Sequence, residues 1–265
     1  MGEPAVLFVG AGPGDPELIT VKGRNALRRA QMVVFAGSLV NPALLAEVPP
    51  EAEIHDSAPL TLDAVVALMV RGAREGKRVV RLHTGDPSVY GAIQEQMAAL
   101  DAHGISHAVI PGVTAAFAAA AALGQELTLP GVAQTVVLTR MEGRTAVPPR
   151  ERLREVARLG TTVCIYLSAA LIEETVAELL AGGAYTPQTP AAVVSRAGWP
   201  DEEIVEGTLA DIAAGVTDRG ISRQALILVG DVLAARRQGV AERSKLYDPD
   251  FSHGYRNSTD RPRQD

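Results

Sequence analysis

The residue types best suited to ligand chemistry gather in a glycine-rich turn near the amino terminus, Gly-Ala-Gly-Pro-Gly-Asp at residues 10–15. This first turn directly follows a short apolar run, and a glycine turn at that place in an α/β sheet lets a ligand approach the backbone. The spacing does not fit the dinucleotide fingerprint, because Asp15 stands where the third glycine is required and Pro13 lacks an amide for a phosphate. We interpret the first turn as a site for a ligand other than a phosphate. A purely structural turn is the alternative.

Two further turns also follow apolar runs. The second turn, residues 84–91, contains Gly85, which admits a ligand, and Asp86, whose carboxylate can accept hydrogen bonds from an amine or a ribose. The third turn, residues 111–114, leads into an alanine-rich stretch whose small side chains leave room for a ligand or another backbone. Each turn has a structural alternative. The Asp-Pro step can simply lead the chain into a helix, and Thr114 can simply cap one.

Composition and missing motifs argue against several classes of protein. The formal net charge of −6, the pI near 5.5 and the aromatic content of 4% do not favour a nucleic-acid partner. A single cysteine excludes a disulfide framework, and Cys164, within an apolar run, is interpreted as an inert core residue. No metal is expected, because the histidines, His83 among them, lack the spacing of a ligand pair. The longest apolar run, residues 115–123, is too short to cross a bilayer, so no membrane contact and a cytoplasmic location are expected.

The elements that must position these turns form an alternating pattern of short apolar runs and longer helical periods. In the first half we expect strands at 5–9, 32–36, 53–55, 79–82 and 109–110, with helices at 20–30, 61–75 and 90–102 and another after residue 114. In the second half we expect strands at 135–138, 162–166, 191–194, 204–206 and 226–229, with helices at 150–159, 170–180 and 209–214. This alternation predicts an α/β protein with parallel sheets covered on both faces. The predicted domains are residues 1–123 and 124–235, followed by a polar tail at 236–265 whose last residues, 257–265, are expected to be disordered.

With the three turns in this order, the chain resembles the tetrapyrrole (corrin/porphyrin) methylase family. The resemblance covers roughly residues 4–235 and continues in the second half through IYLS at 165–168, AAVV at 191–194, GTL at 207–209 and ALI at 225–227. Three segments most resemble the branch that methylates C11 of precorrin-4: GDPSVYG at 85–91, TRMEGRT at 139–145 and SKLYDP at 244–249.

The resemblance implies a fold of two α/β domains with mainly parallel sheets, an active site in the cleft between them, and a homodimer. It also implies S-adenosylmethionine as methyl donor and S-adenosylhomocysteine as product. Carried over residue by residue, the cofactor-binding positions are Pro13, Gly85, Asp86, Val89, Thr114, Ala115, Leu167, Ala197, Ala225 and Leu226.

The implied reaction is methyl transfer to C11 of precorrin-4, giving precorrin-5 in corrin biosynthesis. The substrate carries carboxylates, and arginine pairs with carboxylates bidentately, so Arg140, Arg144 and Arg196 are candidates for binding it. Asp15 is the one candidate proton acceptor, although it also suits a helix cap with Pro16 at the first helical position. Other members of the family remain as alternatives, acting on uroporphyrinogen III, another precorrin or cobalt-precorrin-4. A nucleotide-binding oxidoreductase or regulatory module is the alternative from another class.

Overall fold

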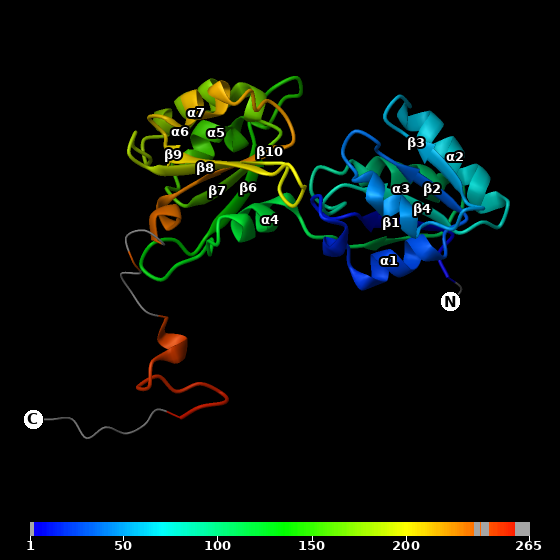
Figure 1. Cartoon of the computed structure of the whole chain (residues 1–265), viewed down its shortest axis with the longest axis horizontal. Coiled ribbons are helices and arrows are strands. Elements are labelled where there is room, and N and C mark those ends of the chain that lie inside the picture. The colour runs from blue at the N-terminus through cyan, green and yellow to red at the C-terminus, as the bar shows by residue number, and fades with distance from the viewer. Residues whose placement is uncertain (1–2, 236–238, 240–243, 258–265) are drawn as a thin grey trace, which may run out of the picture. The chain divides into compact units, whose positions relative to one another are not determined.

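The computed structural model describes residues 3–235, 239 and 244–257 (Figure 1). Its contacts divide the chain into two compact units. The first unit contains the described residues up to Ala122 together with Arg196–Glu203, and the second contains Leu123–Ser195 and the described residues from Ile204 onward. The return of the short segment Arg196–Glu203 to the first unit is not anticipated by the sequence analysis. All but one of the residues expected to be disordered, 257–265, lie outside the described residues.

The first unit is built on a five-stranded sheet in the order β3-β2-β4-β1-β5, in which every neighbouring pair is parallel. Its strands are β1 (Val6–Gly10), β2 (Met32–Phe35), β3 (Glu53–Asp56), β4 (Val79–His83) and β5 (His107–Ile110). Because all five strands point the same way, their carboxyl ends lie along one edge of the sheet. The predicted parallel sheet is therefore confirmed in this unit.

Helices cover both faces of the first sheet, as a parallel sheet requires. They are α1 (Val21–Arg28), α2 (Leu62–Arg74) and α3 (Ile93–Ala102), and a further helix, α4 (Ala115–Ala122), follows the third turn. On one face, Val9 and Leu82 pack with Leu27 of α1. On the opposite face, Phe8 packs with side chains of α2 and α3. Both layers are visible in Figure 1.

The predicted starts of α1 and α2 are confirmed, and at each start a threonine side chain caps the helix. The Thr20 hydroxyl accepts a hydrogen bond from the Gly23 amide (3.0 Å), and Thr61 caps α2 in the same way. The prediction of a helix from residue 90 is wrong, because Tyr90 and Ala92 adopt left-handed backbone angles, with φ of 56° and 49°. The chain therefore leaves the second turn by an irregular path, and α3 begins only at Ile93.

The second unit has a mixed five-stranded sheet in the order β6-β7-β10-β8-β9. Its strands are β6 (Val136–Arg140), β7 (Thr162–Tyr166), β8 (Pro190–Ser195), β9 (Glu203–Thr208) and β10 (Ala225–Val229). β6 and β7 are parallel, whereas β10 runs antiparallel to both β7 and β8. Over the two sheets together the parallel pairs predominate.

Three helices, α5 (Leu153–Ala157), α6 (Ile172–Ala181) and α7 (Ile212–Asp218), lie together on one side of the second sheet (Figure 1). The predicted helix at 150–159 is shorter and interrupted, because Arg152 is extended (ψ 145°) between a 3-10 turn and α5. The predicted helix at 209–214 begins later, because the Asp211 carboxylate accepts the Thr208 amide (2.6 Å) and holds a turn there. Cys164 of β7 is fully buried, as expected of a core residue.

Candidate functional site

The three turns lie at one edge of the first sheet, because β4, β1 and β5 are adjacent parallel strands. Gly10 at the end of β1 is opposite His83 at the end of β4, and Val9 is opposite Ile110 at the end of β5. The first, second and third turns each start within two residues of these strand ends. Open α/β sheets bind their ligands outside this edge. The structure therefore brings together the segments from which the sequence analysis predicted a site.

Glycines let the backbones of the three turns approach one another closely. A Cβ atom at Gly112 would lie only 2.2 Å from the Gly85 carbonyl oxygen, and one at Gly10 only 2.6 Å from the Gly112 Cα. Gly12 and Gly85 also exchange two backbone hydrogen bonds, with N···O distances of 3.2 and 2.7 Å. These glycines therefore allow the three turns to pack against one another.

Gly85 differs from Gly10 and Gly112 because a Cβ atom would fit at this position without a clash. Its φ of +60° favours glycine. The nearest neighbours of a Cβ atom there would be the Thr114 Cα at 3.9 Å and the Val113 oxygen at 4.0 Å. A methyl-sized group would therefore fit beside Gly85, where backbone groups of the third turn border the space.

The carboxylate of Asp86 ties the second turn to the third. One oxygen accepts the Ser88 amide (2.8 Å) and the other accepts the Gly112 amide (2.9 Å). Each carboxylate oxygen has two lone pairs, so capacity remains for a donor on a ligand. Asp86 is half-buried and places a negative charge at this edge of the sheet, which favours a cationic or hydrogen-bond-donating ligand over a phosphate.

Two side chains from remote parts of the chain hold the carbonyl groups of the first turn. The indole Nε1 of Trp199 donates to the Pro13 oxygen (3.0 Å), and the Asn41 amide donates to the Gly14 oxygen (2.8 Å). Asp15 accepts the Glu17 amide (2.8 Å) and caps a short 3-10 helix, which is the structural alternative given for it. The sequence analysis missed Trp199 and Asn41. The only signal for Trp199 is that it is the single tryptophan of the chain.

A buried polar pair lies beneath the second turn, on the α2 and α3 side of β4. Arg81 is only 7% exposed, and its guanidinium donates to the Gln96 side chain, the Val34 carbonyl and the Ser57 hydroxyl, all neutral groups. His83 is also 7% exposed, and its Nε2 is buried without a hydrogen-bond partner among the described residues. Burial, with the nearby Arg81 charge, lowers the pKa of His83 to about 3. His83 is thus a neutral, buried histidine.

The other cofactor-binding candidates divide between the two units. Pro13, Val89, Thr114 and Ala115 lie in or directly beside the three turns, and the Ala197 oxygen would lie 2.9 Å from a Cβ atom at Gly14. The remaining candidates belong to the second unit. There, Leu167 follows β7, is 74% exposed and has a φ of 56°, while Ala225 and Leu226 begin the antiparallel neighbour β10. The β7–β10 register places these three at one edge of the second sheet.

The three candidate arginines have different environments. Arg140 donates to three carbonyls of its own loop, those of Met141, Thr145 and Ala146. Arg196 pairs with Asp201 (2.6 Å) and lies 4.1 Å over the Trp199 ring. The exposed guanidinium of Arg144 makes no ion pair or hydrogen bond within the part of the chain that the structure describes. Only Arg144 therefore offers an uncommitted charge to a carboxylate.

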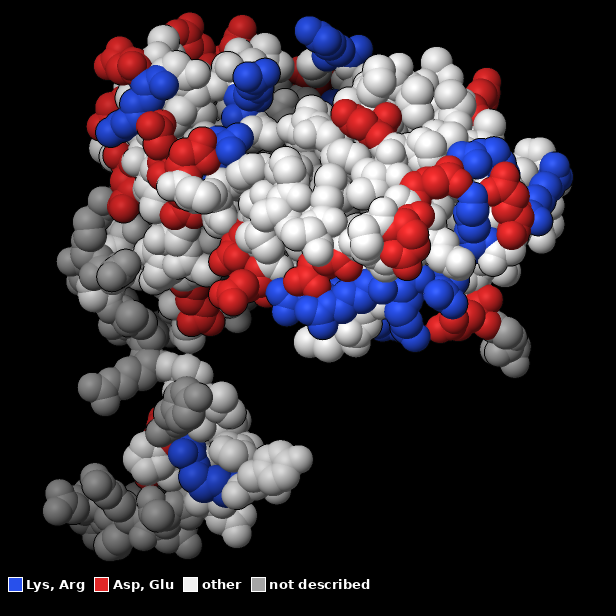
Figure 2. All heavy atoms as spheres, turned by 45° about the vertical axis from the view of Figure 1, so that its right-hand side comes forward, with Lys and Arg blue, Asp and Glu red and all other residues white. Residues whose placement is uncertain are grey.

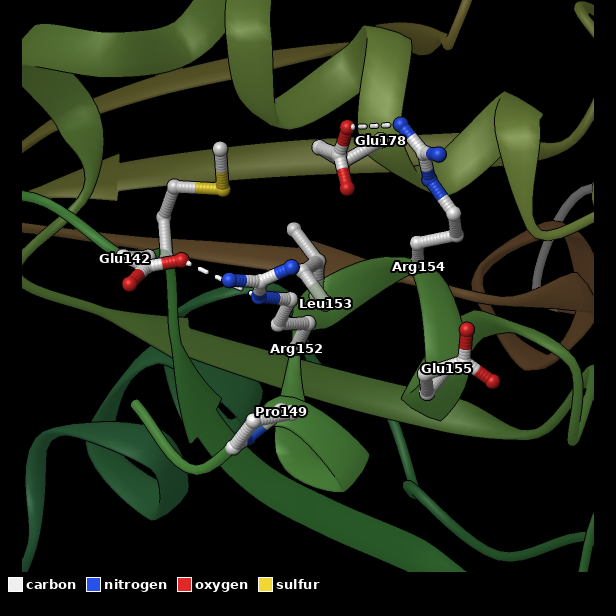
Figure 3. A pocket seen from close by; sticks show the side chains of 8 residues that line it. Glu142, Pro149, Arg152, Leu153, Arg154, Glu155 and Glu178 are labelled. Atoms are coloured by element: carbon white, nitrogen blue, oxygen red, sulfur yellow. Dashed lines mark hydrogen bonds and ion pairs between the residues drawn. The ribbon is translucent and has the colours of Figure 1, made fainter. Parts of the chain in front are cut away.

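A pocket of about 480 Å³ lies in the second unit, beside the Arg140 loop (Figure 3). Two ion pairs line it, Glu142–Arg152 at 3.3 Å and Arg154–Glu178 at 2.5 Å. Figure 3 shows both guanidinium groups turned toward their glutamates. A carboxylate ligand would have to compete with these glutamates, so the pocket does not provide the cationic subsite that the sequence analysis sought.

Charges are mixed elsewhere on the surface as well. Figure 2 shows basic and acidic side chains near one another on the visible face. Among the ion pairs of the chain, Glu53 pairs with Arg71 (2.7 Å) and with Lys77. Among the described residues, no group of three or more His, Cys, Asp or Glu side chains could hold a metal ion. None of the helices described is long and apolar enough to span a bilayer.

The fold is that of an α/β protein in which three glycine-containing turns meet at the carboxyl edge of a parallel sheet. Residues 5–213 match the model of the Tetrapyrrole (Corrin/Porphyrin) Methylases. The chain belongs to this family. Membership rejects the alternative of a nucleotide-binding oxidoreductase or regulatory module.

Relatives and solved structures agree with this assignment over nearly the full length. The chain is 51% identical to a cobalt-precorrin-4 C(11)-methyltransferase of Methanocaldococcus jannaschii, covering 96% of both proteins. It is also 51% identical to a precorrin-4 C(11)-methyltransferase of Mycobacterium tuberculosis, covering 87% of this chain and 92% of the relative.

Among solved structures, a cobalt precorrin-4 methyltransferase of cobalamin biosynthesis aligns with a TM-score of 0.84 at 46% identity, covering 86% of this chain and 95% of the other. A uroporphyrin-III C-methyltransferase of Thermus thermophilus, complexed with S-adenyl homocysteine, aligns with a TM-score of 0.75 at 32% identity, covering 87% and 99%. The predicted two-domain α/β fold is thereby confirmed.

Proposed function

We propose that the chain transfers a methyl group from S-adenosylmethionine to C11 of a precorrin-4 macrocycle. The observation that carries the proposal is the 51% identity, over 96% of both chains, to a protein named for C11 methylation of cobalt-precorrin-4. The equal identity to a relative named for precorrin-4 supports the same carbon as the acceptor. Identity to the uroporphyrin-III methylase is lower, at 32%.

The residues at the edge of the first sheet fit a sulfonium donor. Backbone groups border the space beside Gly85, and the half-buried Asp86 carboxylate supplies a negative charge. Pro13 and Asp15 in the first turn disfavour a phosphate, because one lacks an amide and the other is anionic. A related structure is complexed with S-adenyl homocysteine, which supports the same class of ligand here.

When bound, S-adenosylmethionine would supply a methyl group on a sulfonium, whose carbon–sulfur bond breaks as the carbon–carbon bond forms and whose electron pair stays on sulfur, giving the neutral thioether S-adenosylhomocysteine. The chain's own contribution is placement. Gly85 and Thr114 would border the donor, while Asp86 would hold the second and third turns in register and accept a donor hydrogen bond. Aligning two reactants in this way can remove roughly 7–11 kcal/mol of the barrier. No covalent protein intermediate is needed, because the macrocycle carbon is the nucleophile.

Substrate binding requires cations that can meet several carboxylates. We propose Arg144 as a direct contact, because its guanidinium is exposed and has no partner among the described residues. Arg140 would act by shaping the same loop through its three carbonyl contacts. Arg196 would need to exchange Asp201 for a substrate carboxylate.

The test is a methyl-transfer assay followed by mass spectrometry, with S-adenosylmethionine and one acceptor in each reaction. The acceptors are precorrin-4, cobalt-precorrin-4 and uroporphyrinogen III. We expect one added methyl at C11 of a precorrin-4 macrocycle and none on uroporphyrinogen III. Comparing the reactions with precorrin-4 and cobalt-precorrin-4 shows whether the enzyme methylates the metal-free or the cobalt-containing macrocycle. Methylation of uroporphyrinogen III alone would contradict the proposed acceptor.

We also propose that the chain works as a homodimer, as the family resemblance implies. Large apolar side chains are exposed in both units, among them Phe117 at 60% and Leu167 at 74%. A second copy could cover such side chains. Light scattering coupled to size-exclusion chromatography tests this, and a monomer mass at micromolar concentration would contradict it.

A further inference from the structure

Trp199 lies on the segment Arg196–Glu203, which packs with the first unit although the strands on either side, β8 and β9, belong to the second sheet. The segment is held by its own contacts. The Trp199 amide donates to the Arg196 oxygen (2.9 Å), and the Gly198 amide donates to the Glu202 carboxylate (2.8 Å). Arg196 adds its ion pair with Asp201 and its position over the indole. The indole ring of Trp199 therefore contacts the first turn from a loop that its own hydrogen bonds and ion pair stabilise.

The contact between the indole and the first turn is close and directional. A Cβ atom at Gly14 would lie 2.1 Å from the Trp199 Cδ1, so the ring fills the place that a side chain would take. The indole N–H bonds the Pro13 oxygen, and the Asn41 amide bonds the next carbonyl, that of Gly14. Two consecutive carbonyl groups are thus pinned from outside the turn, which fixes the peptide between Pro13 and Gly14.

We propose that Trp199, together with Asn41, is a positioning residue for the methyl donor. It holds the Pro13–Gly14 peptide in the conformation that the donor meets, so that binding needs no reordering of the first turn. This inference rests on the proposed function, because it requires the donor to bind at these turns. Without the indole N–H, part of the binding free energy would be used to order the turn.

The variants separate the hydrogen bond from the packing. Trp199→Phe retains an aromatic ring over Gly14 and removes the N–H donor. Asn41→Asp retains the oxygen that accepts the Ala43 amide (3.0 Å) and places a carboxylate against the Gly14 carbonyl. Tyr185→Phe is the matched control, because it removes a buried donor to a backbone carbonyl (Tyr185 hydroxyl to Thr161, 2.6 Å) in the core of the second unit.

Isothermal titration calorimetry with S-adenosylhomocysteine gives the first readout. We expect Kd to rise about three- to tenfold in Trp199→Phe, the equivalent of one lost neutral hydrogen bond. Asn41→Asp should change in the same direction, and Tyr185→Phe should bind like the wild type. In turnover assays, KM for the donor should rise while kcat at saturating donor stays within about twofold, because the indole holds the turn and does not touch the reacting atoms.

Trp199 is the single tryptophan of the chain, so the emission of the wild type reports this one contact. We expect its emission maximum to stay the same on titration with S-adenosylhomocysteine, because the first turn is already ordered before the donor binds. A shift of the emission maximum on binding, or wild-type affinity in both Trp199→Phe and Asn41→Asp, would overturn the positioning role and leave the proposed function standing. Absence of binding to the wild type would instead remove the proposed function itself.

Discussion

Replacing Gly112 by alanine adds a methyl group where backbone atoms already stand. The new Cβ would lie 2.2 Å from the Gly85 oxygen and 2.8 Å from the Gly10 Cα, and neither neighbour is a flexible side-chain end. The φ of Gly112 is outside the left-handed region, so the substitution tests close packing alone. The first and second turns must shift away from the third, which strains the Asp86–Gly112 hydrogen bond and the two hydrogen bonds between Gly12 and Gly85.

The magnitude follows from these contacts. Two backbone hydrogen bonds contribute about 1 kcal/mol each, and an overpacked site costs at least about 1 kcal/mol, so Gly112→Ala should lose at least about 3 kcal/mol of stability. For a chain of this size that lowers Tm by about 6–12 °C. Because the same movement displaces Asp86 from the Gly112 amide, the affinity for S-adenosylhomocysteine should fall at least tenfold.

Differential scanning calorimetry and binding calorimetry measure the two effects in the same preparation. Gly143→Ala is the matched control, because its Cβ would meet only the Leu171 Cδ1 at 3.5 Å, an ordinary contact. The control should melt within about 1 °C of the wild type. Wild-type Tm and wild-type affinity in Gly112→Ala would refute the argument that close backbone packing forms the site.

Three further outcomes are expected. Asp86→Asn replaces an acceptor of two backbone amides by a group with one acceptor oxygen, which should cost about 1–3 kcal/mol in chemical denaturation and weaken S-adenosylhomocysteine binding. The pKa of His83 is about 3 in the fold, below its usual 6.5, because of burial and the Arg81 charge. Its contribution to stability is complete above pH 6.5 and is lost as the pH falls toward 3, by up to about 1.4 kcal/mol per pH unit. Urea denaturation between pH 7 and pH 4.5 should therefore show a shallower loss in His83→Asn, and identical slopes would contradict this. Burial raises the pKa of the Cys164 thiol to about 12, so iodoacetamide should label the denatured chain and leave the native one unlabelled, as intact-mass spectrometry can show.

The sequence predicts the strands and the three turns well because both depend on local signals. Short apolar runs mark the strands, and glycine, proline and aspartate mark the turns at their carboxyl ends. The directions of the strands in the second sheet, in contrast, cannot be predicted from local signals. The apolar pattern of β10 is the same whether it pairs parallel or antiparallel, so its antiparallel position between β7 and β8 is fixed only by the tertiary fold.

The contacts that complete the site are long-range and leave little trace in the sequence. The bond from Trp199 to Pro13 joins residues 186 positions apart, and Asn41 reaches Gly14 across 27 positions. The sequence alone also does not show which of the candidate arginines is available to bind a carboxylate. The sequence marks Arg140 as a cation, but only the structure shows that three carbonyls of its own loop already hold its guanidinium.

The proposed function requires the methyl donor to bind at the carboxyl edge of the first sheet. The most direct test is a crystal structure of the full chain grown with S-adenosylhomocysteine. We expect the ligand to contact Gly85, Asp86 and Thr114, and the first turn to keep the conformation that it has without ligand. A ligand bound instead in the pocket between Glu142 and Arg152, with no contact to these turns, would contradict it.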